Sequence, residues 1–96
     1  MKLTVDYLGS IKQTLGLKQE EQVHLKDDAS LIDLLSMLAE KYGDAFKKSV
    51  YEPKDPDLKP FYILSLNGVM LNQLKGLETP LKDGDHLVFL PVVTGG

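Results

Sequence analysis

Residues 30–43 read SLIDLLSMLAEKYG, and this stretch decides how the rest of the chain is interpreted. Its apolar side chains recur every three or four residues and form one stripe along a helix: Leu31, Leu34, Leu35, Leu38 and Tyr42. Ser30 is a favourable N-cap, and the Asp33 carboxylate three residues later can accept a hydrogen bond from the backbone of Ser30. Gly43 suits the position just after a helix. The sequence therefore predicts one amphipathic helix with a buried face.

Two alternating segments precede this helix. Residues 2–8 and residues 22–26 each alternate apolar with polar side chains, which is the period of a β-strand. The mixed stretch between them, residues 11–22, fits either a short helical turn or a long hairpin loop. Its acidic pair, Glu20 and Glu21, is typical of a solvated turn. We expect the two strands to pair antiparallel.

The segment after the helix contains a proline-rich stretch. Residues 44–50 can add another helical turn, and residues 51–60 read YEPKDPDLKP. Because proline neither continues a helix nor enters a central strand, we expect residues 51–60 to form an exposed loop. Loops of this length are often functional or mobile.

The last third of the chain contains a hairpin and a final strand. Residues 61–66 form an apolar strand, Asn67-Gly68 is a strong hairpin signal, and residues 69–71 form the return strand. A turn at residues 82–85 leads into the strand 86–93. Apolar residues on both faces of that strand indicate a central position in the sheet.

The order strand, strand, helix, strand, short strand, strand predicts an α+β chain with the β-grasp, or ubiquitin-like, arrangement. A mixed sheet of four to five strands would pack on the one main helix. The final strand would lie in the middle of the sheet, beside the first strand and parallel to it. With 96 residues, the chain is expected to form a single domain, 1–96, whose residues 93–96 are a flexible C-terminal tail.

Composition excludes several classes of function. The net charge is −3 and the positive residues are all lysines, so binding of nucleic acid is not expected. The lack of cysteine excludes disulfides, zinc–thiolate sites and thiol nucleophiles. The N-terminal stretch MKLTVDYL is not expected to act as a signal peptide, and no apolar segment has the length expected of a membrane span. We expect a soluble, cytoplasmic protein without a membrane partner.

Side chains that could bind a metal or act in catalysis are scattered along the sequence. His24 and His86 lack the spacing of metal ligands, and Asp83 and Asp85 around Gly84 indicate a tight turn, so no metal site is predicted. No acid–base pair, nucleophile triad or phosphate loop is found, so the chain is not expected to be an enzyme on its own.

The last sixteen residues, LKDGDHLVFLPVVTGG, resemble the end of the MoaD/ThiS family of ubiquitin-like sulfur carriers. The family pattern is roughly L-x-D-G-D-x-V-x-φ-x-P-P-V-S/A-G-G. Eight residues match it in order: Leu81, Asp83, Gly84, Asp85, Phe89, Pro91, Gly95 and Gly96. Two positions depart from the pattern, since Val92 replaces the second proline and Thr94 replaces serine or alanine. The helix at residues 30–43 and the Asn67-Gly68 turn also look similar to the family.

The resemblance implies that Gly96 is the reactive residue, its carboxylate being adenylated and then converted to a thiocarboxylate. Thr94 and Gly95 would thread through a narrow channel, since glycine permits close backbone approach. Phe89, Leu90, Pro91 and Val92 would dock a partner. Apolar residues on the outer face of the sheet, namely Leu66, Val88 and Leu90, would extend that docking surface.

The partners implied are an adenylating, ubiquitin-activating-like enzyme and a sulfur acceptor. ATP would be used by the activating enzyme, and no cofactor would be bound permanently. The small, MoaD-like subunit of molybdopterin synthase, in molybdenum cofactor biosynthesis, is the favoured role. Three alternatives stay open: a carrier for thiamin or tRNA thiolation, a modifier conjugated through Gly96, and an interaction module with an inert tail.

Overall fold

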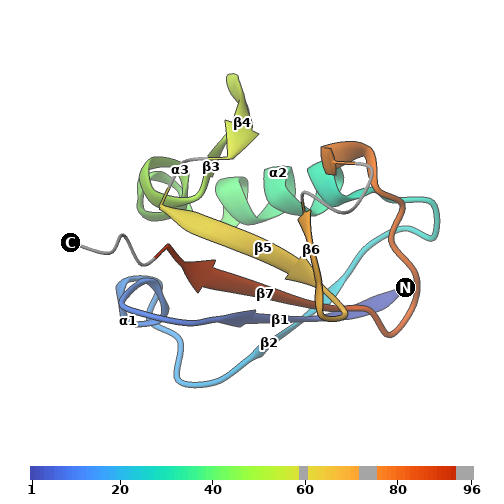
Figure 1. Cartoon of the computed structure of the whole chain (residues 1–96), viewed down its shortest axis with the longest axis horizontal. Coiled ribbons are helices and arrows are strands. Elements are labelled where there is room, and N and C mark those ends of the chain that lie inside the picture. Colours follow the sequence, from blue (N-terminus) through green and yellow to red (C-terminus); the bar gives the residue numbers. More distant parts are fainter. Residues whose placement is uncertain (59–60, 72–75, 93–96) are drawn as a thin grey trace.

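The protein folds as one mixed sheet with a helix crossing one of its faces (Figure 1). The computed structural model describes residues 1–58, 61–71 and 76–92, with the backbone alone at 55–58. Five strands form the main sheet in the order β2-β1-β7-β5-β6. Their bounds are β1 Lys2–Tyr7, β2 Glu21–His24, β5 Tyr62–Leu66, β6 Val69–Met70 and β7 His86–Pro91. The β-grasp expectation is confirmed.

Three helices and a small second sheet complete the described chain. The helices are α1 Ile11–Thr14, α2 Leu31–Tyr42 and α3 Asp44–Ser49, and a 3₁₀ turn covers Gly76–Glu78. The second sheet pairs β3, Tyr51–Glu52, with β4, Asp55–Leu58. The short helical turn at residue 11 and the extra turn after Gly43, which the sequence left open, are thus α1 and α3.

Strand β7 lies in the centre of the sheet, as the sequence predicts. It runs parallel to β1, with Val5 opposite Leu87 and Tyr7 opposite Phe89, and antiparallel to β5. Its side chains alternate strictly: Leu87 and Phe89 are fully buried, while Val88 and Leu90 lie half-buried on the other face.

The core lies between the sheet and α2. Helix α2 covers one face of the sheet in both ribbon views, and its buried stripe consists of Leu31, Leu34, Leu35, Leu38 and Ala39. Tyr7 stacks on Phe89 with ring centroids 5.1 Å apart, and Phe46 meets Phe89 edge-on at 6.0 Å. Since offset-stacked and edge-to-face rings are favoured geometries, Phe89 joins the sheet to α3.

The predicted N-cap of α2 is confirmed. The backbone N–H of Ser30 donates to the Asp33 carboxylate over 2.8 Å, in a capping box. At the other end, Gly43 adopts φ +64° and its N–H donates to the carbonyl of Ala39, so glycine ends the helix.

The prediction of an exposed loop at residues 51–60 is wrong for most of that segment. Residues 51–58 form the β3–β4 hairpin, and Tyr51 is almost fully buried. Pro53 lies in its turn, whereas Pro56 lies within β4. A two-stranded sheet has only edge strands, which tolerate a residue that lacks an N–H. Residues 59–60 lie outside the described residues.

The prediction of a solvated turn at Glu20-Glu21 is wrong for Glu21. The Glu21 side chain is buried, accepts a hydrogen bond from the Tyr42 hydroxyl over 2.6 Å, and forms an ion pair with Lys41. The Tyr7 hydroxyl lies 3.5 Å from its other oxygen. Burial first, and then the Glu21 charge, raise the pKa of Tyr7 well above its ordinary value. Burial and the hydrogen bond to Glu21 raise the pKa of Tyr42 in the same direction, so both phenols stay neutral donors.

Among the residues that the structure describes, none of the helices combines the length and the apolar character that crossing a membrane requires.

We expect Glu21→Gln to lower the free energy of unfolding by about 1–3 kcal/mol, because a buried charged acceptor with several donors is replaced by an amide. The matched control is Glu20→Gln, at an exposed neighbour, with an expected change within about 0.5 kcal/mol. Urea denaturation of both variants measures the difference. Equal effects would contradict a role for the Glu21 hydrogen bonds.

The stability contributed by the capping box is expected to depend on pH. The hydrogen bond from the Ser30 backbone lowers the pKa of Asp33 below its ordinary value. A carboxyl group whose pKa is lower in the folded state adds stability at pH values above its unfolded-state pKa. This stability is lost as the pH falls through its folded-state pKa. The stability advantage of wild type over Asp33→Asn should therefore shrink below about pH 4. Urea denaturation at several pH values tests this, and an advantage that stays constant into acid would refute it.

Candidate functional site

The C-terminal end of β7 is where the chain leaves the sheet. Pro91 is the last residue of the strand, opposite Tyr62, and the Val92 N–H donates to the Phe61 carbonyl over 2.9 Å. The chain is therefore held by the sheet as far as Val92. The predicted tail residues Thr94, Gly95 and Gly96 lie outside the described residues.

The turn after β1 packs against this end of β7. The Leu8 N–H donates to the Phe89 carbonyl over 2.9 Å, extending the parallel pairing by one residue beyond β1. The following residue, Gly9, lies against the ring of Pro91. The exit point of the chain is thus enclosed by β5 on one side and by the start of α1 on the other.

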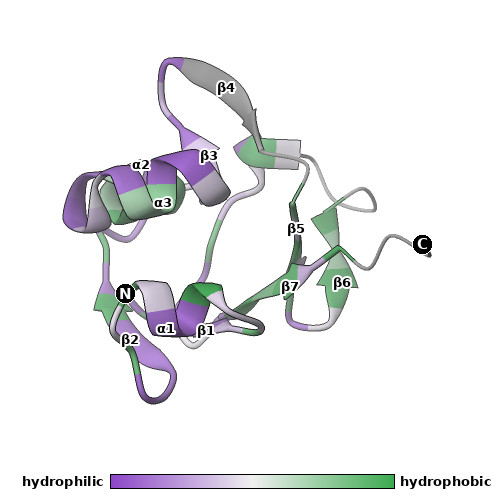
Figure 2. Ribbon diagram, turned by 90° about the vertical axis from the view of Figure 1, so that its left-hand side faces the viewer, coloured by the Kyte–Doolittle hydropathy of each residue, from purple (hydrophilic) through white to green (hydrophobic). Residues whose placement is uncertain are grey.

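An apolar surface surrounds the exit point, on the face of the sheet opposite α2. The pairing registers place seven side chains there: Leu8, Phe61, Ile63, Met70, Val88, Leu90 and Val92. We call them the outer apolar surface. Phe61 is 58% exposed and Ile63 is 43% exposed. Figure 2 shows the hydrophobic colouring of β5, β6 and β7, away from α2. Grouped exposed apolar side chains are typical of interaction sites.

The four predicted docking residues differ in how exposed their side chains are. Pro91 and Val92 are exposed, and Leu90 lies half-buried on the outer face. Phe89 is fully buried against Tyr7, so the prediction that its side chain contacts a partner is wrong. The alternation of β7 explains this, because residues of opposite parity face opposite sides.

Of the three predicted outer-face residues, Val88 and Leu90 are on the outer face. Leu66 is 7% exposed and pairs with Leu87 on the core face, so its predicted position is wrong. Phe61, Ile63, Met70 and Leu8 were missed. The alternation of residues 61–66 could have identified Phe61 and Ile63 as outer-face residues, once it was known which alternate residues of β5 face the core.

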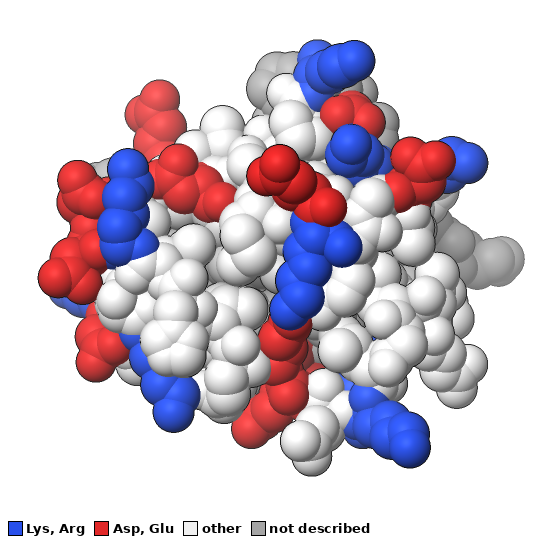
Figure 3. Space-filling model, turned by 180° about the vertical axis from the view of Figure 1, so that it is seen from behind, with Lys and Arg blue, Asp and Glu red and all other residues white. Residues whose placement is uncertain are grey.

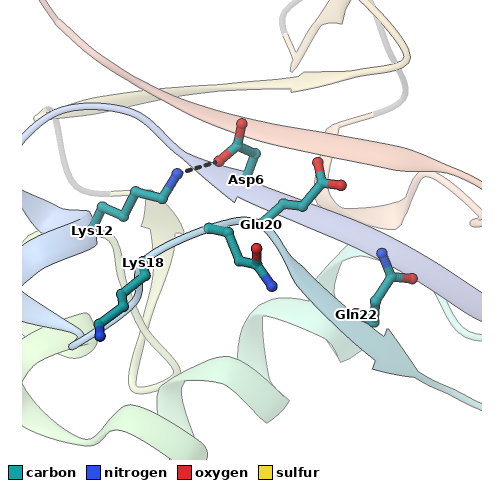
Figure 4. A pocket seen from close by; sticks show the side chains of 6 residues that line it. Asp6, Lys12, Lys18, Glu20 and Gln22 are labelled. Carbon is teal, nitrogen blue, oxygen red and sulfur yellow. Dashed lines mark hydrogen bonds and ion pairs between the residues drawn. The ribbon is translucent and has the colours of Figure 1, made fainter.

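A hollow of about 420 Å³ lies beside the outer face of β1 (Figure 4). Asp6, Lys12, Lys18, Gln19, Glu20 and Gln22 line it. Lys12 and Asp6 form an ion pair at 3.2 Å. Side-chain atoms of Asp6, Glu20 and His86 lie within 4.8 Å of one another, a proximity that sequence spacing could not reveal because β1 and β7 meet only in the fold. Lys12 already balances the Asp6 charge, and the prediction of no metal site stays a prediction.

Charged side chains are mixed in sign over the helix side of the molecule. In Figure 3, lysines alternate with aspartates and glutamates over that face. A nucleic-acid interface needs a continuous basic patch, and this view shows none among the described residues.

The sheet order, the crossing helix and the parallel central strands define a ubiquitin-like β-grasp protein. Two solved structures share this fold at 26% identity. Small archaeal modifier protein 1 of Methanosarcina acetivorans superimposes with a TM-score of 0.77 over 99% of this chain and 96% of that one. A complex of subunits 1 and 2 of the molybdopterin-converting factor of Helicobacter pylori contains a chain that matches over 100% of both, with a TM-score of 0.65.

The sequence identifies the family. The profile of the ThiS family matches residues 5–96, so the chain belongs to the ThiS family. A candidate sulfur carrier protein of Archaeoglobus fulgidus is 32% identical over 66% of this chain and 69% of its own length. Small archaeal modifier protein 3 of Haloferax volcanii is 28% identical over the full length of both chains. The relatives are thus named as carriers and modifiers.

The buried and exposed faces of the sheet should respond differently to truncation. We expect Phe89→Ala to lower the free energy of unfolding by about 3–5 kcal/mol, because it leaves a cavity between Tyr7 and Phe46. Ile63→Ala, on the outer apolar surface beside it, should change that free energy by no more than about 0.5 kcal/mol. Urea denaturation measures both. A large loss with Ile63→Ala would show that the outer apolar surface is structural.

Proposed function

We propose that this protein is a sulfur carrier whose Gly96 carboxylate is adenylated and then converted to a thiocarboxylate. The observation that carries the proposal is the exit point of the chain. There, the sheet holds the chain as far as Val92, four residues before Gly96 in the sequence and beside the outer apolar surface. Membership of the ThiS family and the likeness to a candidate sulfur carrier support it.

The chemistry requires activation because a carboxylate is a poor electrophile. The Gly96 carboxylate attacks the α-phosphorus of ATP, and pyrophosphate leaves. The terminal sulfur of a persulfide on a partner then attacks the acyl carbon, and AMP leaves. A thiol cleaves the resulting acyl disulfide, giving a thiocarboxylate and a new disulfide. The activating enzyme binds and uses the ATP, so this domain needs no permanently bound cofactor of its own. We place the chemistry in the cytoplasm.

The domain itself must contribute most of the docking energy. Fixing the backbone of each tail residue costs about 1–2 kcal/mol of entropy. The outer apolar surface offers the area to offset this cost, with Leu90 and Val92 next to the tail. We therefore propose that the adenylating enzyme and the sulfur acceptor both cover this surface in turn. The chain acts with these enzymes and not as an enzyme alone.

We propose that the acceptor is the large subunit of molybdopterin synthase, for which this chain would be the MoaD-like small subunit. The support is the Helicobacter pylori complex, in which a chain of the same fold is bound to a second subunit. Thiamin and tRNA thiolation use the same carrier logic and are the alternative acceptors. The net charge of −3 and the mixed signs over the helix side do not favour a nucleic-acid partner.

A second function, protein modification through Gly96, is favoured by one observation. The relative that aligns over the full length of both chains is named a small archaeal modifier protein. Activation by adenylation is common to both functions. They differ in the product, which is a free thiocarboxylate for a carrier and an isopeptide to a lysine for a modifier.

We expect the intact mass of the protein to rise by the replacement of one oxygen with one sulfur. The incubation contains an adenylating enzyme, ATP and a persulfide source, and deletion of Gly96 should abolish the gain. Omitting ATP is the control, since the unactivated carboxylate does not react. An unchanged mass, with an enzyme that is active on another carrier, would refute the carrier proposal. Conjugates in a native lysate that depend on Gly96 would then support the modifier.

A further inference from the structure

The contact between Gly9 and Pro91 joins two segments that are remote in the sequence. Gly9 adopts φ +89°, a conformation that side chains with a Cβ rarely adopt. A Cβ added at Gly9 would lie 3.2 Å from Cγ and 3.5 Å from Cβ of Pro91. The first distance is shorter than an ordinary carbon–carbon contact and the second is an ordinary one, so the backbone of Gly9 lies close to the proline ring.

Pro91 and Val92, the last two described residues, are therefore held from two sides. On one side, the turn at Gly9 meets the ring of Pro91, and this turn is itself fixed because the Gly9 carbonyl accepts from the Lys12 N–H at the start of α1. On the other side, the Val92 N–H is bonded to Phe61. The nitrogen and Cα of the proline ring belong to the backbone, so a push on the ring that a change of ring pucker does not absorb is passed to the chain that follows.

We propose that Gly9 is a positioning residue for the activation of Gly96. The missing side chain at Gly9 lets Pro91 lie against the β1–α1 turn, and this contact sets the position of Val92, which precedes the last four residues. The inference rests on the proposed function, because the position of Val92 matters only if Gly96 must reach a reactive phosphate.

The short distance along the sequence from Val92 to Gly96 makes the position of Val92 important. Four residues follow Val92. They span at most about 14 Å when fully extended, at about 3.3–3.6 Å per residue. A tail extended in the narrow channel of the activating enzyme has no slack, so a displaced Val92 would displace the carboxylate, and a misplacement of about 1 Å can cost about 100-fold in rate.

The chain provides a matched control in Gly16, just beyond the other end of α1. Gly16 also has a positive φ, +76°, but a Cβ there would meet no atom within 4 Å. Alanine at Gly9 or at Gly16 therefore brings the same kind of backbone strain, and only alanine at Gly9 also pushes on Pro91.

The test measures kcat and KM for adenylation of the full chain by its activating enzyme, followed as pyrophosphate release. A Cβ at Gly9 displaces the ring by a few tenths of an ångström. We therefore expect Gly9→Ala to lower kcat about 4-fold with KM unchanged. Gly16→Ala should change neither parameter. Ile63→Asp, on the outer apolar surface, should raise KM and keep kcat. Equal kcat values for Gly9→Ala and Gly16→Ala would overturn the proposal.

A double substitution tests whether Gly9 acts through Pro91. Pro91→Ala should lower kcat by itself, and adding Gly9→Ala to it should cause no further loss, because the ring that would be displaced is gone. Losses that multiply in the double variant would overturn the proposal.

A readout without the enzyme separates this inference from the proposed function. The amide NMR signals of Phe61 and Val92 should shift in Gly9→Ala and stay in place in Gly16→Ala. If wild type is not adenylated, the proposed function fails. The NMR shifts alone then decide whether the contact between Gly9 and Pro91 positions Val92. Unshifted signals in Gly9→Ala would refute it.

Discussion

The parallel pairing of β1 with β7 is the constraint on which the rest of the structure depends. Parallel neighbours cannot be joined by a tight turn, so the chain between them must cross the sheet. Here the crossing includes α2, whose leucine stripe covers the inner face of both strands. The stacked rings of Tyr7 and Phe89, one from each strand, fill the centre of that layer. The same pairing brings the end of β7 beside the turn at Gly9, so the core and the exit point share one cause.

The edge strand β2 is tied to this core by the buried polar side chain of Glu21 as well as by the apolar side chain of Val23. The Glu21 carboxylate accepts a hydrogen bond from the hydroxyl of Tyr42 and pairs with the ammonium of Lys41, and both of these residues lie at the end of α2. A buried carboxylate is tolerated when donors surround it. Burial is the main cause of the raised pKa values of Tyr7 and Tyr42, and their interactions with Glu21 add to it. Strand and helix are thereby fixed in relative position.

Local patterns predicted those features that depend on near neighbours in the chain. The cap of α2 needs only Ser30 and Asp33, and the alternation of β7 needs only its own residues, so both were predicted correctly. Glu21 was missed because its partner Tyr42 lies 21 residues away, and spacing along the chain gives no sign of it. Phe89 was misplaced because a motif records which residue is present and not the face on which it lies. The β3–β4 hairpin was missed because prolines argued against strands, while the anchoring of Tyr51 in the core is a tertiary effect.

The two edges of the sheet have a consequence for self-association. Strand β6 has two residues and β2 has four, so neither edge offers a long row of free backbone N–H and C=O groups. A second sheet can add to an edge only where such groups are available, and short edges make poor templates for strand addition and fibril growth. The protein can therefore carry an exposed apolar face at high concentration without its sheet continuing from one molecule into the next.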